Sequence, residues 1–191
     1  LRPNVSIVRH QSNQAPPTSL SPVTVPMRMV VALASPTNLP KLILSEERAS
    51  IEEALNTHPE SVQAIFCEPA THKNLSEALV DAPIFHYAGH AKMEQTASKI
   101  FGLLEGKGKL YLDDGDGEYD PMSTEQLSRL LSEAKTRLAF LGGCETARRD
   151  DRNVWSSLAA HLLNAGLFAV VGMQYKIGNK NATAFADKFY Q

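Results

Sequence analysis

The feature that most constrains this chain is a regular alternation of short apolar runs with segments of helical spacing. The apolar runs lie at residues 29–34, 62–67, 83–88, 137–141 and 167–172. The helical segments lie at residues 45–55, 75–80, 123–133, 154–163 and 182–189. Nearly continuous apolar runs are typical of parallel strands whose two faces are both covered by helices. The alternation therefore predicts an α/β fold with a mostly parallel central sheet flanked by helices.

Length and composition agree with one such domain. The chain has 191 residues, of which 43% are hydrophobic and 21% are charged, as in ordinary globular proteins. Its 19 lysines and arginines face 21 aspartates and glutamates, for a formal net charge of −2. Because binding to phosphates needs a basic surplus, we expect no direct nucleic-acid partner. No apolar run reaches the roughly 18 residues of a membrane span, so we expect no membrane partner.

The first 27 residues differ from the rest. Residues 5–9 alternate apolar and polar side chains as a short strand does, and residues 10–26 are rich in proline, serine and threonine. We therefore divide the chain into an N-terminal strand and Pro-rich linker at residues 1–27 and a main domain at residues 28–191. The chain opens at Leu1 and stops at Gln191 within a predicted helix, and we expect it to be a fragment of a larger protein.

Local signals predict where several elements begin and end. Ser45 is the expected N-cap of its helix, and Ser123 with Gln126 has the spacing of a capping box. Gly89 is expected to close the strand at residues 83–88, and glycines 142 and 143 to stop the strand at residues 137–141. Residues 100–104 and 109–112 are expected to form a hairpin between these strands.

Three common kinds of site are excluded by their spacing. Residues 106–108 read GKG, but they neither open a helix after a strand nor precede serine or threonine, as phosphate-binding loops require. No Gly-x-Ser-x-Gly motif of a serine hydrolase is present. The acidic residues 113–120 do not fit a calcium loop, since the best frame puts Tyr119 where the sharp turn needs glycine. A solvated loop is the preferred interpretation.

His86 and His90 have the spacing of metal ligands on a helix, but they belong to a strand-like run. At about 3.3 Å per residue, four positions along a strand separate them by roughly 13 Å, too far to share one ion. We therefore expect no metal and no other cofactor. His86 is interpreted as a packing residue or as support for the site, and His90 as the accessible histidine at the end of its strand.

The chain has two cysteines, Cys67 and Cys144, too few for a disulfide framework. Such usage fits a reducing compartment, and we expect a cytoplasmic location. Cys67 lies within an apolar strand and is interpreted as a core residue. Cys144 follows two glycines and precedes a helix, where backbone N–H groups stabilise a thiolate. Taken alone, Cys144 fits a buried core thiol equally well.

His90 and Cys144 together favour catalysis. Each directly follows a predicted strand, and the carboxyl ends of parallel strands are where α/β folds carry their sites. The histidine lies about 50 positions before the cysteine, which is the order of caspase-like peptidases. A neutral imidazole at this place can deprotonate the thiol and then protonate the leaving amine.

At these residues the chain resembles the CHAT domain, a caspase-like member of the clan CD cysteine peptidases, which include separase. The resemblance rests on residues 86–91, which read HYAGHA, and on residues 141–147, which read LGGCETA. Weaker agreement is found in residues 29–40, 110–112, 122–127 and 164–172, so the likeness covers roughly residues 28–191. It implies a caspase-like three-layer sandwich. The Gln-Ala-Cys sequence of caspases themselves is absent.

The resemblance also implies roles for individual residues. His90 is expected to act as general base and acid, Cys144 as nucleophile, and the N–H groups of Ala91 and Cys144 as oxyanion donors. We expect the substrate pocket to include His86, Gln174, Tyr175 and Asn179. Separase-like relatives often carry an aspartate just after the last strand, where this chain has Asn179, so we expect an uncharged P1 side chain.

Two functions from different classes follow from the resemblance. The first is a cysteine endopeptidase that cuts a specific partner protein, such as a gasdermin-like pore former, after activation through an upstream sensor or repeat domain or another partner. The second is a catalytically silent CHAT-like interaction module. The presence of both His90 and Cys144 favours the first, because a degenerate copy is expected to have lost one of them.

Overall fold

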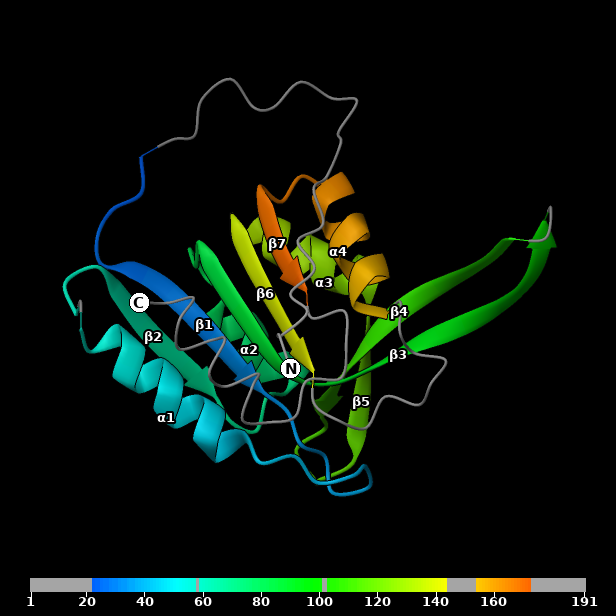
Figure 1. Cartoon of the computed structure of the whole chain (residues 1–191), viewed down its shortest axis with the longest axis horizontal. Helices are drawn as coiled ribbons and strands as arrows, with labels where there is room; N and C mark the ends of the chain where they lie inside the picture. The colour runs from blue at the N-terminus through cyan, green and yellow to red at the C-terminus, as the bar shows by residue number, and fades with distance from the viewer. Residues whose placement is uncertain (1–21, 58, 101–102, 144–153, 173–191) are drawn as a thin grey trace, which may run out of the picture.

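The computed structural model describes residues 22–57, 59–100, 103–143 and 154–172, in which a seven-stranded sheet carries helices on both faces (Figure 1). The strands are β1 (Met27–Leu33), β2 (Val62–Cys67), β3 (Ile84–Ile100), β4 (Leu103–Asp113), β5 (Tyr119–Ser123), β6 (Leu138–Gly143) and β7 (Ala169–Gly172). The helices are α1 (Leu44–Leu55), α2 (His72–Ala78), α3 (Thr124–Glu133) and α4 (Val154–Asn164). The predicted α/β fold class is confirmed.

Most of the sheet is parallel. β1 pairs with β2 on one side and with β3 on the other, β3 pairs with β6, and β6 pairs with β7, all in parallel. β4 and β5 extend the sheet in antiparallel pairing, β4 against β3 and β5 against β4. The parallel strands are the near-continuous apolar runs of the sequence, as expected for strands covered on both faces.

The side chains of β1 and β3 alternate between two apolar layers. Those of one layer, including Met29, Val31 and Leu33, pack against the inner face of α1. Those of the other layer, including Phe85 and Tyr87, pack against α2, α3 and α4. The result is a sandwich of helix, sheet and helices, in agreement with a caspase-like architecture, and it leaves the carboxyl ends of the strands on one edge (Figure 1).

β3 continues beyond the point where the sequence predicts its end. Its pairing with β1 ends at Leu33 with Ala88, and its pairing with β6 ends at Gly89 with Gly143. From His90 onward β3 pairs with β4 instead, and the distal parts of both strands extend away from the sheet as a two-stranded arm (Figure 1). The expectation that Gly89 closes the strand is therefore wrong, because a new antiparallel partner replaces the lost parallel ones.

Three further boundaries differ from the sequence prediction. Glycines 142 and 143 lie inside β6, since both still pair with β3. The hairpin arms are β3 and β4, so residue 100 belongs to one arm and residues 103 and 104 belong to the other. β5 was not predicted, because its five residues include Pro121 and its pairing is with β4 alone. Proline is tolerated in such an edge strand, where its missing N–H costs no ladder bond.

The helix caps were predicted in part. The capping box of Ser123 and Gln126 is confirmed at the start of α3. Ser45 is not a cap, because α1 begins one residue earlier and its N-cap, Ile43, provides no side-chain hydrogen bond. α2 has a capping box of its own, formed by Thr71 and Asn74.

Some predictions concern residues outside the described part of the chain. They are the strand at residues 5–9 and the helix at residues 182–189. These stay predictions. We also keep as a prediction the division between residues 27 and 28, which falls at the start of β1. Within the described residues, none of the helices has the length and apolar character needed to cross a membrane.

We predict that Ser123→Ala lowers the free energy of unfolding by about 1 kcal/mol, because it leaves a backbone N–H at the start of α3 without its acceptor. Ser45→Ala is the matched control, since Ser45 lies in the first turn of α1 without a capping bond. Urea unfolding monitored by circular dichroism measures both. Equal losses in the two variants would contradict the assignment.

Candidate active site

The candidate site lies where the parallel pairing of β3 with β6 ends. Gly89 and Gly143 are the last Cα partners of the two strands, and the next residues along the chain are His90 and Cys144. Neighbouring strands of a sheet lie about 4.8 Å apart. Cys144 itself lies outside the described residues, and the described part of the site is the surroundings of His90.

The His90 side chain is buried and held by a backbone carbonyl. It is 7% exposed, and its Nε2 lies 2.8 Å from the carbonyl oxygen of Pro40, in the connection between β1 and α1. A carbonyl oxygen only accepts hydrogen bonds, so Nε2 must carry the proton. In the neutral ring Nδ1 is then the nitrogen able to accept a proton. This tautomer is the one that a general base needs when Nε2 is anchored.

Burial also favours the neutral form of this ring. Desolvation lowers the pKa of His90 below its ordinary value, and the hydrogen bond to the Pro40 carbonyl opposes this by stabilising the charged form. The net direction is downward. A histidine with a lowered pKa is unprotonated near neutral pH and is ready to take a proton.

A buried tyrosine holds the backbone of the same histidine. The Tyr87 hydroxyl lies 2.7 Å from the carbonyl oxygen of His90 and 2.8 Å from that of Tyr111, and donates its proton between them. Burial raises the pKa of Tyr87, so this donor stays protonated. The ring folds over Gly89, where an added Cβ would lie 2.6 Å from Cζ of Tyr87. Glycine is therefore required before His90 by close packing.

His86 lies on the other face of β3 from Tyr87, against α1. It is fully buried, its Nε2 lies 3.1 Å from Oε1 of Glu47, and its ring stacks on Phe140 with centroids 4.6 Å apart and planes 7° from parallel. The arrangement fits the packing or supporting role expected from the sequence. Glu47 also lies beside β6, because its Oε1 is 3.6 Å from where a Cβ of Gly142 would be.

The remaining predicted site residues divide into two groups. Ala91 is half-buried and pairs with Leu110 of β4, directly after the histidine. Cys144, Gln174, Tyr175 and Asn179 lie outside the described residues, and their roles stay predictions. Among the residues that the structure describes, no three or more histidine, cysteine, aspartate or glutamate side chains gather as a metal site would require.

Cys67 is a core residue, as predicted. It is buried at the end of β2, its Sγ lies 3.7 Å from the carbonyl oxygen of Asn74, and burial raises the pKa of its thiol. A thiol with a raised pKa is a poor nucleophile near neutral pH. Cys67 is therefore a natural internal control for any reaction of Cys144.

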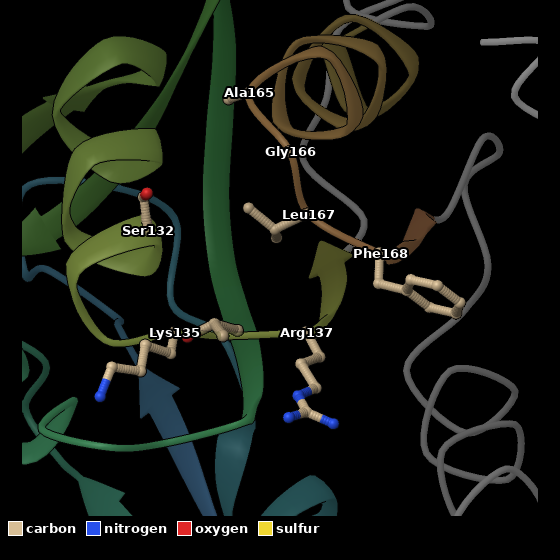
Figure 2. Close-up of a pocket in the computed structure, with 8 residues that line it drawn as sticks. Ser132, Lys135, Arg137, Ala165, Gly166, Leu167 and Phe168 are labelled. Atoms are coloured by element: carbon tan, nitrogen blue, oxygen red, sulfur yellow. The ribbon is translucent and has the colours of Figure 1, made fainter. Parts of the chain in front are cut away.

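A hollow of about 230 Å³ lies at the opposite edge of the sheet (Figure 2). Its lining includes Lys135 and Arg137, which precede β6, and Phe168, which precedes β7. It is thus at the amino ends of the parallel strands, whereas sites in open α/β sheets lie at the carboxyl ends. The hollow is not part of the candidate site.

Sequence reasoning missed two parts of the site. The Pro40 carbonyl is a backbone group, and no residue type marks which carbonyl will meet a ring 50 positions away. Tyr87 lies three residues before His90 and could have been considered, but its place in an apolar run indicated a core residue and gave no sign that its hydroxyl bonds to the His90 carbonyl.

Comparison with known families confirms the resemblance found in the sequence. A family model described as the CHAT domain matches residues 3–191, a span that contains both sequence blocks singled out above. None of the curated proteins matches the sequence.

We predict that Gly89→Ala lowers the free energy of unfolding by about 1–3 kcal/mol, because the added methyl overlaps the Tyr87 ring. The control is Gly172→Ala in β7, whose added carbon would meet the Trp155 backbone at an ordinary 3.4 Å. Urea unfolding measures both variants. An unaltered stability for Gly89→Ala would show that the Tyr87 ring does not occupy this place.

The pKa of His90 also gives stability a pH dependence. In the unfolded chain the pKa of this histidine is about 6.5, and in the folded protein its pKa is lower. As the pH falls through about 6.5 the unfolded state binds the proton first, so the free energy of unfolding decreases. We expect His90→Gln to reduce this loss between about pH 7 and pH 5. Equally steep losses in both proteins, measured by urea unfolding, would contradict the lowered pKa.

Proposed function

Because the chain belongs to the CHAT family, which is related to caspase-like cysteine peptidases, we propose that it is a cysteine endopeptidase with His90 and Cys144 as its dyad. The observation that carries the proposal is the register of β3 with β6. Gly89 and Gly143 are partners in neighbouring parallel strands; His90 is the next residue of β3, and Cys144 is the next residue along the chain after β6. Because neighbouring strands lie about 4.8 Å apart, this register supports an imidazole and a thiol within reach of each other.

The state of His90 supports the role of general base. Its Nε2 donates to Pro40 and its lowered pKa keeps the ring neutral. In the proposed reaction Nδ1 takes the thiol proton of Cys144 while sulfur attacks the carbonyl carbon of the scissile peptide. The resulting imidazolium then gives this proton to the leaving amine as the C–N bond breaks. A water molecule, deprotonated by the same imidazole, then attacks the thioester, which releases the acid product and regenerates the Cys144 thiol.

The developing oxyanion needs N–H donors placed in advance. The family resemblance assigns this role to the N–H groups of Cys144 and Ala91. The Tyr87 hydroxyl supports the arrangement, because it fixes the carbonyl of His90 and so the peptide unit that joins His90 to Ala91. The substrate is proposed to be a specific partner protein with an uncharged P1 residue, in keeping with Asn179 near the expected pocket.

The test is cleavage of a partner protein by the whole, activated protein. We expect Cys144→Ala and His90→Ala each to reduce the rate at least about a hundredfold, because each removes one member of the dyad. Cys67→Ala is the matched control and is expected to keep its activity, since Cys67 is a buried thiol of the core. Mass spectrometry of new protein termini in a partner proteome measures the rate and identifies P1.

A peptide probe with a thiol-reactive group distinguishes a peptidase from a silent interaction module. We expect labelling of Cys144 that disappears in Cys144→Ala and persists in Cys67→Ala. Retained cleavage in either dyad variant contradicts the proposed dyad. An inert Cys144 with no new termini in the activated protein contradicts the endopeptidase and favours the module.

A further inference from the structure

The connection that contains Pro40 is hydrogen-bonded to an acidic loop from a distant part of the chain. The connection is residues 34–43, between β1 and α1, and the acidic loop is residues 114–118, between β4 and β5. Thr37 bonds to the loop twice: its backbone N–H and its hydroxyl both donate to the carbonyl oxygen of Gly117, at 2.7 Å each.

Asn38 uses both ends of its amide in the same contact. Its Nδ2 donates to the Glu118 carboxylate, and its Oδ1 accepts from the backbone N–H of Tyr119 at 3.1 Å. Thr37 and Asn38 are both exposed, so these bonds do little for the hydrophobic core. Their effect is to fix the path of the connection two residues before Pro40.

The conformation of the acidic loop allows these hydrogen bonds to form. The Asp114 carboxylate accepts from the N–H groups of Asp116 and Glu118, at 2.8 and 3.0 Å. Gly117 has φ of +98°, and an added Cβ would lie 3.0 Å from Oγ1 of Thr37. Glycine is needed here for both reasons. Two of the carboxylates that suggested a solvated loop or a cation site, Asp114 and Glu118, therefore have a definite structural use.

The other side of the connection is fixed as well. The Ser35 hydroxyl accepts from the N–H of Leu42 at 3.1 Å, and the N–H of Leu39 donates to the carbonyl of Pro36 at the same distance. Pro40 lies between these anchors, and its carbonyl receives Nε2 of His90 at 2.8 Å. The acidic loop is thus joined to the candidate base by its hydrogen bonds to Thr37 and Asn38, by the short stretch of backbone to Pro40, and by the bond from His90 to the Pro40 carbonyl.

We propose that Asn38 is a positioning residue for His90, acting with the acidic loop to hold the Pro40 carbonyl where it orients the imidazole. The inference rests on the proposed function for its catalytic consequence. The geometric part, that Asn38 acts on His90 through Pro40, is independent of any activity. Variants that lack the hydrogen bonds of Asn38 are expected to fold, but with a less well oriented His90 ring.

The first variant is Asn38→Ala. Without the hydrogen bonds of Asn38 the Pro40 carbonyl is held less firmly, and so is the His90 ring that it orients. Displacement of a catalytic group by about 1 Å can lower the rate up to a hundredfold. We expect kcat to fall by about tenfold to a hundredfold with KM little changed. The Pro40 bond raises the pKa of His90, so its weakening lowers that pKa further and moves the acid limb of the pH–rate profile to lower pH.

Three further variants separate positioning from general loss of stability. Asn74→Ala removes an equally engaged amide, which bonds to Pro69 and Thr71 in the connection before α2, and we expect it to leave kcat and the pKa of His90 unchanged. Asn38→Asp places a second carboxylate against Glu118 and is expected to behave like Asn38→Ala. The double variant Asn38→Asp with Glu118→Gln restores a donor and an acceptor with exchanged roles, so we expect kcat and the pKa to recover.

The decisive readout is the NMR titration of the His90 ring, because it requires no activity. A lower pKa in Asn38→Ala, recovery in the double variant and no change in Asn74→Ala support the inference even where no substrate is cut. An unchanged pKa in Asn38→Ala, or an equal change in Asn74→Ala, overturns it. Retained cleavage in His90→Ala overturns the proposed function alone, so the two failures are distinguishable.

Discussion

The structure depends on a change of partner within β3. Up to Gly89 this strand is the centre of a parallel sheet, with β1 and β6 as neighbours, and from His90 onward it pairs with antiparallel β4. The change occurs where the parallel strands β1 and β6 end, so His90 lies at the carboxyl edge while its backbone is still held in a sheet. A histidine in a free loop after the strand would have to lose more conformational entropy before it could act as an oriented base.

His90 is fixed at two independent points. The Pro40 carbonyl, in the connection between β1 and α1, holds its ring, and the Tyr87 hydroxyl, in the layer that packs against α2, α3 and α4, holds its backbone. The first contact selects the tautomer, and burial lowers the pKa of the ring. A neutral, oriented imidazole beside the end of β6 is what general-base catalysis by a thiol enzyme requires, and it explains why Gly89 and Tyr87 belong to the same short block as the histidine.

Much of the fold was predictable from the sequence because it depends on local patterns. The apolar runs predicted the parallel strands, and the Ser123–Gln126 spacing predicted the start of α3. The end of β3 was not predictable in the same way, because it is set by pairing with β4, whose contacts are distant in sequence. Pro40 was missed since its contribution is a carbonyl that every residue has. The acidic loop was predicted to be solvated, and most of its residues are exposed. Its contact with Thr37 and Asn38 was missed, because nothing in its composition shows that they lie against it.

The central claim is that His90 activates the thiol of Cys144. The most direct measurement is the second-order rate constant for alkylation of Cys144 by iodoacetamide at neutral pH, in the whole protein. We predict that His90→Ala lowers this rate constant at least about tenfold, because the thiol loses its base. The control His161→Ala, on the exposed side of α4, is predicted to leave it unchanged. An equal rate constant with and without the His90 imidazole would contradict the account.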